Sequence, residues 1–142
     1  MSHQNSLFQL KNEIFISKVD FFSIREHIAE KRGKHLDYAL GSKNLEVAID
    51  FIVPKGLPKI NERPRLGIMM ELHDPIYLFD KKGDIEEGYG KGTWKQIKCG
   101  PAKIVRKSNH SWIINLGNEQ YNFYIPPPFQ KKKGQFLIKR MK

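Results

Sequence analysis

The sequence predicts an α+β fold, in which one main N-terminal helix packs on a mostly antiparallel, twisted sheet and a C-terminal β-meander can curl toward a barrel. Apolar residues recur at helical spacing between Asp20 and Gly41. Later segments alternate apolar and polar residues with the period of two that a half-buried strand requires. The 142 residues suit one domain, and no internal repeat divides them. We therefore expect a single domain over residues 1–142.

The first third of the chain contains the predicted helix. A short strand is predicted at "EIFISK", before a helix through "DFFSIREHIAEKRGKHLDYALG". Ser23 and Glu26 match the S-x-x-E capping box of a helix start, and Gly41 is a natural stop. Gly33 lies inside this segment, where it costs about 1 kcal/mol relative to alanine. The predicted apolar helical face consists of Phe21, Ile24, Ile28, His35 and Ala39.

The middle of the chain predicts strands around a long loop. "LEVAIDFIV" (residues 45–53) alternates apolar and other residues and is the clearest strand signal. "PKGLPKINERPR" contains three prolines and a glycine, which predict a loop. "LGIMMELH" and "IYLFD" are predicted to be strands on either side of Asp74 and Pro75.

The C-terminal third predicts a β-meander whose register follows from its turns. A two-residue turn at Gly117 and Asn118 pairs Ile114 with Tyr121, so that apolar side chains share one face. A three-residue turn at residues 108–110 pairs Ile104 with Ile114. Three prolines at 126–128 end the ladder, and "QFLIK" predicts a short strand. The opposite face then carries Lys103, Val105, Lys107, Ser111, Ile113, Asn115, Gln120, Asn122 and Tyr124.

Positive charge is concentrated in the last third of the chain. The net charge is +10 and the pI is about 9.7. Residues 91–142 contain twelve Lys and Arg and a single acid, Glu119, whereas acids and bases nearly balance in residues 1–90. We divide the domain into a charge-balanced part (1–90), a basic β-meander (91–130) and a basic tail (131–142). Such a localised field predicts a polyanionic partner.

Nucleic acid is the partner that this pattern predicts, because nucleic-acid interfaces combine cations for phosphates with aromatic rings for bases. Asn115 and Asn122 are expected to donate hydrogen bonds, and Tyr124 to stack on a base. RNA and DNA remain open. The lysines expected to contact phosphate are Lys95, Lys98, Lys103, Lys107, Lys131, Lys132 and Lys133.

Several kinds of site are not predicted. "GYGKGT" lacks both the spacing and the following helix of a phosphate-binding P-loop, so we interpret it as a connection between strands. The five histidines lack helical metal-ligand spacing, and the single cysteine, Cys99, cannot form an internal disulfide. No cofactor or metal is therefore expected. The chain lacks a secretion signal and a long apolar run, which predicts a cytoplasmic protein without membrane contact.

Two alternatives to nucleic-acid binding stay open. The basic face suits an acidic protein, so the chain could act as a small inhibitor or adaptor. Asp50 with Glu71 and His73 loosely resembles the carboxylate set of metal-dependent nucleases, and a metal-independent ribonuclease would use His, Arg and Lys. The pattern favours a binding protein over an enzyme, and a nuclease is the enzyme class that it would suit.

Overall fold

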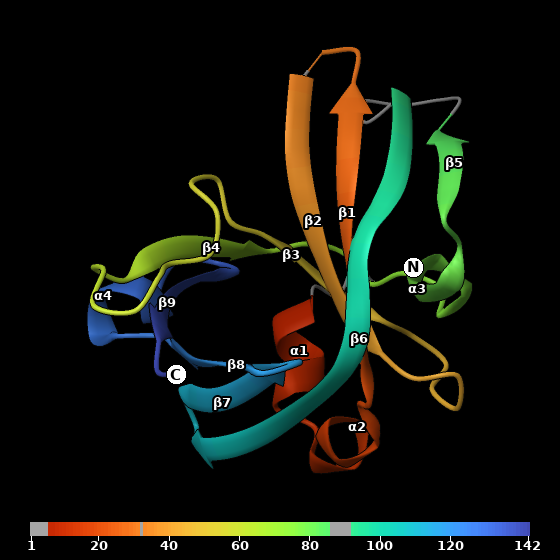
Figure 1. The fold of residues 1–142 in the computed structure, drawn as a ribbon. Helices are drawn as coiled ribbons and strands as arrows, with labels where there is room; N and C mark the ends of the chain where they lie inside the picture. The colour runs from red at the N-terminus through yellow and green to blue at the C-terminus, as the bar shows by residue number, and fades with distance from the viewer. Residues whose placement is uncertain (1–5, 32, 86–91) are drawn as a thin grey trace.

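Antiparallel strands dominate the computed structural model, which describes residues 6–31, 33–85 and 92–142. In these ranges nine strands are accompanied by four short helices (Figure 1). The strands are β1 (Phe21–Ala29), β2 (Gly33–Gly41), β3 (Ile49–Ile52), β4 (Arg65–Met69), β5 (Lys82–Ile85), β6 (Gly92–Ser108), β7 (Ser111–Leu116), β8 (Glu119–Tyr124) and β9 (Gln135–Arg140). The helices are α1 (Ser6–Leu10), α2 (Glu13–Lys18), α3 (Ile76–Phe79) and α4 (Pro127–Gln130).

The strands close into an eight-stranded antiparallel barrel. Their order is β1-β2-β3-β4-β9-β8-β7-β6, and β6 pairs back onto β1. β6 is 17 residues long, so its N-terminal part pairs with β1 and β5 and its C-terminal part with β7. β5 joins the sheet outside the closed ring. Closure through β1 and β6 removes the exposed edges that an open sheet of this size would carry.

An arm extends from one end of the barrel. It consists of β5 with residues 25–29 of β1, 33–37 of β2 and 92–96 of β6, and it rises above the barrel in Figure 1. Apart from Asp37, which pairs with Ile52 of β3, these residues lie beyond the parts of β2 and β6 that pair with β3 and β7. Both faces of the arm therefore lie outside the closed ring.

The predicted α+β fold with one main helix is wrong, because the described residues form a closed antiparallel β-barrel with only short helices, and residues 21–41 form the β1–β2 hairpin. Ile24 and Ile28 are four residues apart, a spacing that places side chains on one face of a helix and also on one face of a strand. The intervening residues decide between the two. Arg25 and His27 lie on the opposite side of β1 from Ile24, and Gly33 has the positive φ of 74° that suits the turn region.

The short predicted elements are partly wrong as well. "EIFISK" is α2 rather than a strand, and the Asn12 side chain caps it by accepting hydrogen bonds from the backbone N–H groups of Ile14 (3.0 Å) and Phe15 (3.2 Å). "IYLF" is α3, whose first turn is fixed by Asp74 Oδ1 accepting from Ile76 N at 3.0 Å. Local hydrogen bonds from side chains to the backbone thus override the strand propensity of these apolar residues.

The predicted strands elsewhere are confirmed, over shorter ranges. β3 lies within the segment predicted for it, β4 begins at Arg65, one residue before its predicted segment, and β9 contains "QFLIK". The β7–β8 hairpin has the predicted register, with Ile114 opposite Tyr121, and Gly117 has the positive φ of 62° that its turn requires. Ile104 pairs with Ile114 as predicted, although a register shift lets Ser108 pair with Ser111.

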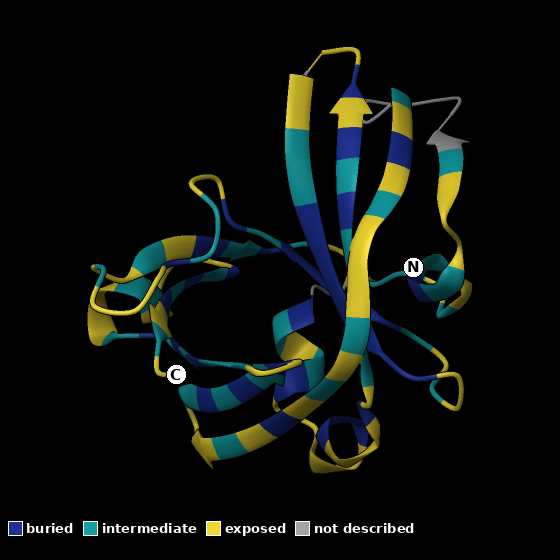
Figure 2. Ribbon diagram, in the orientation of Figure 1, coloured by how far each residue is buried: buried dark blue, intermediate teal, exposed yellow. Residues whose placement is uncertain are grey.

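The core fills the barrel, and helices cover it. The inward side chains include Phe51, Phe123 and Phe136, which pack in edge and stacked contacts. Figure 2 shows the resulting alternation of buried and more exposed residues along β7. α1 packs against this core, where the Trp112 indole N–H donates to the Leu10 carbonyl at 2.7 Å. None of the helices in the described ranges is long and apolar enough to cross a bilayer.

Candidate nucleic-acid interface and the polar face of the arm

One side of the barrel presents the residues that the sequence predicts to face outward. We define the wall face as the outward side chains of residues 103–105 of β6, 111–115 of β7, 120–124 of β8 and 137–139 of β9. Strand pairing sets Lys103 opposite Asn115, Asn115 opposite Gln120, and Asn122 opposite Lys139. The predicted Lys103, Asn115, Asn122 and Tyr124 therefore share one face, because side chains alternate along each strand.

The two asparagines of the wall face differ in what they can offer a ligand. Asn122 Nδ2 donates to Ser111 Oγ at 2.9 Å and to the Trp112 carbonyl at 3.0 Å. Asn115 instead accepts from Gln120 Nε2 at 3.1 Å through its side-chain oxygen. Among the described residues, the Asn115 amide nitrogen has no hydrogen-bond partner and can donate to a ligand, whereas that of Asn122 already donates within the sheet.

Five of the predicted lysines are exposed cations. Lys103 projects from β6, Lys107 lies beside the β6–β7 turn, and residues 131–133 follow α4. Within the described part of the chain, none of these five ammonium groups lies within ion-pair distance of a carboxylate. Tyr124 is half-buried at the end of β8, and its burial raises the pKa of the phenol. These groups can attract and stack on a polyanion.

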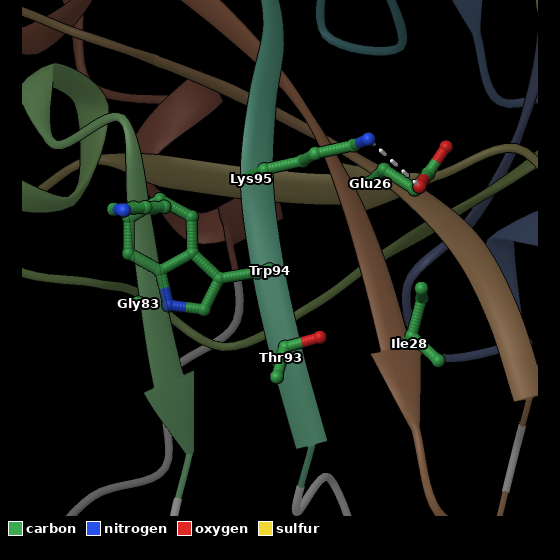
Figure 3. Close-up of a pocket in the computed structure, with 7 residues that line it drawn as sticks. Glu26, Ile28, Gly83, Thr93, Trp94 and Lys95 are labelled. Atoms are coloured by element: carbon green, nitrogen blue, oxygen red, sulfur yellow. Dashed lines mark ion pairs between the residues drawn. The ribbon is translucent and has the colours of Figure 1, made fainter.

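The remaining two predicted lysines lie elsewhere and face carboxylates. Lys95 belongs to the arm, where its Nζ is 3.8 Å from Glu26 Oε1 (Figure 3). It lines a cavity of about 600 Å³ together with Trp94, which lies over Gly83. Lys98 lies on the side of β6 opposite to Lys103, and its exposed Nζ is 3.8 Å from Glu119 Oε1. Lys95 and Lys98 therefore lie outside the wall face, although they are close to Lys103 in the sequence.

A second group of polar residues lies on the face of the arm that α3 covers. Strand alternation gives this face Arg25 from β1, Asp37 from β2 and Gln96 from β6. Gln96 Nε2 donates to Ser23 Oγ at 2.9 Å and to the Leu78 carbonyl at 3.0 Å, so it ties α3 to the sheet. Because α3 shields these polar side chains from water, each one that lacks a hydrogen-bond partner lowers the stability of the fold.

Arg25 is the centre of this polar face. Its side chain is fully buried, and Nη1 donates to the Tyr77 carbonyl at 3.0 Å. The guanidinium lies over the Tyr77 ring and 4.9 Å from the centroid of Trp94. Burial lowers the pKa of Arg25, although nearby carboxylates, Asp50 and Asp37 among them, oppose that shift. In the described residues, Nε and Nη2 of Arg25 have no hydrogen-bond partner.

Two of the three nuclease candidates meet beside Arg25. His73 Nε2 lies 2.9 Å from Asp50 Oδ2, and the imidazole stacks on the Tyr77 ring with centroids 4.3 Å apart. Asp50 is buried, whereas Glu71 is exposed. The structure therefore brings together a His–Asp pair with a buried carboxylate and a partly exposed imidazole. A metal-dependent nuclease would need several carboxylates converging on solvent-accessible ions.

Three further side chains converge next to this pair. His27 Nδ1 is 3.6 Å from Asp37 Oδ2, and His35 Nε2 is 3.3 Å from Asp37 Oδ1. Burial, followed by the charge of Asp50, raises the pKa of Asp37 to about 6. A search of the sequence for histidines at helical spacing does not find this cluster, because His27 and His35 are partners across the β1–β2 hairpin. The sequence signal is H-x-D in one strand and a histidine opposite it.

The glycine-rich segment that follows β5 ends at Gly92, the first residue of β6. Residues 86–91 of "EEGYGKGTWK" lie outside the described residues. Gly92, the first described residue after them, approaches β1 so closely that a Cβ atom would lie 1.9 Å from the Ile28 carbonyl oxygen. The lack of a side chain at Gly92 therefore allows β6 to approach β1 closely enough to pair with it.

A functional proposal for this chain has to be argued from the geometry of its structure. No protein-family model matches the chain. No curated protein matches its sequence either.

Proposed function

We propose that the protein binds single-stranded nucleic acid through the wall face and the adjoining lysines. The observation that carries this proposal is that the predicted lysines fall into two groups, one with a nearby carboxylate and one without. Lys103, Lys107 and residues 131–133 have no carboxylate within ion-pair distance in the described residues, whereas Lys95 and Lys98 do. Unpaired ammonium groups gain most from phosphate, because no existing ion pair has to be broken.

Each class of residue would have a separate role in binding. The lysines would contact phosphates, and they would displace condensed counterions without reading sequence. Asn115 would donate hydrogen bonds, and the half-buried Tyr124 would offer a ring edge or face to an unpaired base. Aromatic stacking requires bases that are not paired in a duplex, which is why a single strand is favoured.

The first test is a salt titration of binding. Fluorescence anisotropy would be measured with labelled single-stranded RNA, single-stranded DNA and duplex DNA. Five phosphate contacts on a single strand predict an affinity loss on the order of 100-fold between about 50 and about 200 mM salt. Tight binding that is indifferent to salt would contradict the proposal. A failure to bind any oligonucleotide would overturn it and leave an acidic protein as the partner to seek.

Matched variants then locate the interface. The double variant Lys103→Gln and Lys107→Gln removes two charges from the proposed interface. The control, Lys95→Gln with Lys98→Gln, removes the same charge from lysines that face Glu26 and Glu119. We expect the first variant to weaken binding at least several-fold and to reduce the salt slope, while the control changes both much less. Equal losses in both variants would show that net charge alone drives binding.

A further inference from the structure

We propose that His27, His35 and Asp37 form a binding site for one divalent transition-metal ion, and that Zn²⁺ is the ion their donor set fits best. The site would lie on the arm, at a distance in sequence and in the fold from the lysines of the proposed interface. It is independent of nucleic-acid binding. The chemistry, the geometry and the electrostatics of the three residues each support it.

The β1–β2 hairpin brings the three donors together. His27 and His35 are cross-strand partners, and Asp37 lies two residues after His35, so all three project from the same face of the sheet. Their ligand atoms all lie within 4.8 Å of one another. Because the backbones are held by regular antiparallel pairing, the donors are positioned by the fold rather than by a loop.

The separations are close to those that a bound ion requires. Zn²⁺ lies about 2.0–2.2 Å from nitrogen and oxygen ligands, so tetrahedral donors are separated by about 3.4 Å. His27 Nδ1 is 3.6 Å from Asp37 Oδ2, and His35 Nε2 is 3.3 Å from Asp37 Oδ1, so each imidazole is near that spacing from one of the two carboxylate oxygens. Small rotations of the imidazole rings would bring the histidine nitrogens to the same spacing.

The donor set indicates which class of ion would bind. Two imidazoles and one carboxylate suit Zn²⁺ and its first-row neighbours, whereas Mg²⁺ and Ca²⁺ prefer sites built of oxygen. Three protein ligands also leave a fourth position for water or another small ligand, as in zinc sites that perform chemistry. The cluster has the composition of an open site rather than of a closed structural one.

The surroundings favour a cation at this point. Asp37 and Asp50 are both buried, and Arg25 is the one guanidinium among the groups that act on Asp37. Burial removes water from the Asp37 carboxylate, and a second buried carboxylate, Asp50, acts on it electrostatically. A divalent ion bound to Asp37 would offset both penalties. It would also neutralise repulsion between the two carboxylates.

An ion has a path to the cluster. The His35 side chain is 24% exposed, whereas those of His27 and Asp37 are each 7% exposed. His35 also lines a cavity of about 500 Å³ together with Ile52 and Pro54. Solvent therefore reaches one ligand while the other two stay shielded. This arrangement would allow an ion to enter and a water to remain bound.

The test is a Zn²⁺ titration of the full chain after treatment with a chelator. Isothermal calorimetry near neutral pH should give one ion per chain for the wild type. His35→Ala should weaken the affinity at least ten-fold. The matched control is His73→Ala, which removes a half-exposed histidine from the neighbouring Asp50 pair and should leave Zn²⁺ binding unchanged. Absence of binding, or equal binding by wild type and His35→Ala, would overturn the site.

A spectroscopic measurement keeps the test decisive if the variant misfolds. Co²⁺ replaces Zn²⁺ in nitrogen and oxygen sites, and its visible absorption is strong in four- or five-coordinate sites and weak in octahedral ones. The wild type loaded with one equivalent of Co²⁺ should show the strong bands, and Zn²⁺ should abolish them. Weak octahedral bands alone would mean adventitious surface binding and would refute the proposal. Oligonucleotide affinity should not change on chelation, which separates this result from that of the proposed function.

Discussion

Arg25 is a buried cation that connects a helix to the sheet. It is a cation on a strand, fully covered by α3 and β6, and it lies among Tyr77, Trp94 and two buried carboxylates. A charge is normally kept at the surface, because the loss of hydration is not recovered without partners. Here aromatic rings, one backbone hydrogen bond and nearby negative charge supply the compensation. The residue thereby joins α3 to the sheet.

Replacing Arg25 should therefore destabilise the fold. We expect Arg25→Ala to lower the free energy of unfolding by about 3–5 kcal/mol, because it leaves Asp37 and Asp50 buried without their cation and opens space beneath Tyr77. Urea denaturation followed by tryptophan fluorescence measures the change. Lys103→Ala is the control, and as an exposed substitution it should stay within about 0.5 kcal/mol. A loss below about 1 kcal/mol for Arg25→Ala would show that the guanidinium is not compensating those carboxylates.

At the scale of elements, α1 acts as a cover for the barrel core. The helix has only five residues, which is far too short to be stable in isolation. Leu10 is fully buried, its carbonyl accepts from the Trp112 indole, and Ser6 N donates to the Met70 carbonyl at 2.9 Å. Tertiary contacts thus hold this helix in place. Its amphipathic character is visible in Phe8, which is 60% exposed.

Two truncations within α1 test this role. Leu10→Ala should lower the free energy of unfolding by about 2–5 kcal/mol, because it removes a fully buried side chain and leaves a cavity beside Trp112. Phe8→Ala removes a larger but mostly exposed side chain from the same helix and should cost much less. Chemical denaturation of both proteins gives the comparison. Similar losses in the two variants would mean that α1 does not pack as a cover.

The whole molecule is organised around β6. This strand closes the barrel with β1, continues the wall with β7 and supports the arm with β5. The proposed interface and the proposed metal site therefore lie on different parts of one scaffold. β5 differs from the barrel strands, since its four residues pair with β6 and with no other strand in the described ranges. Edge strands of this length open more easily than strands paired on both sides.

Hydrogen exchange should show this difference. We expect backbone amides of β1, which is paired with both β2 and β6, to exchange much more slowly than those of β5. Exchange measured by NMR or mass spectrometry at peptide resolution gives the order of protection. β7, which is paired on both sides in the barrel wall, serves as the protected reference. If β5 is protected as strongly as β7, the arm and the barrel unfold as one cooperative unit.

Local patterns determined the C-terminal hairpin and the residues that face outward from it. Gly117 and Asn118 can form only a tight turn of few types, and the alternation of Trp112, Ile114 and Leu116 leaves one register with an apolar face. Turn chemistry and alternation agree there, so the wall residues Lys103 and Tyr124 could be placed from the sequence. The uneven charge distribution is likewise a property of the chain itself.

Only the tertiary structure decided that residues 21–41 form a hairpin rather than a helix. It also decided how the strands of the arm are arranged. Isoleucines four residues apart satisfy both a helix and a strand, and pairing of β1 with the distant β6 stabilises the strand. Long-range pairing also separated Lys95 and Lys98 from the other lysines and set His27 opposite His35. Residues close in sequence share a face only after strand partners are chosen. That choice depends on burying the whole barrel core, which no short segment contains.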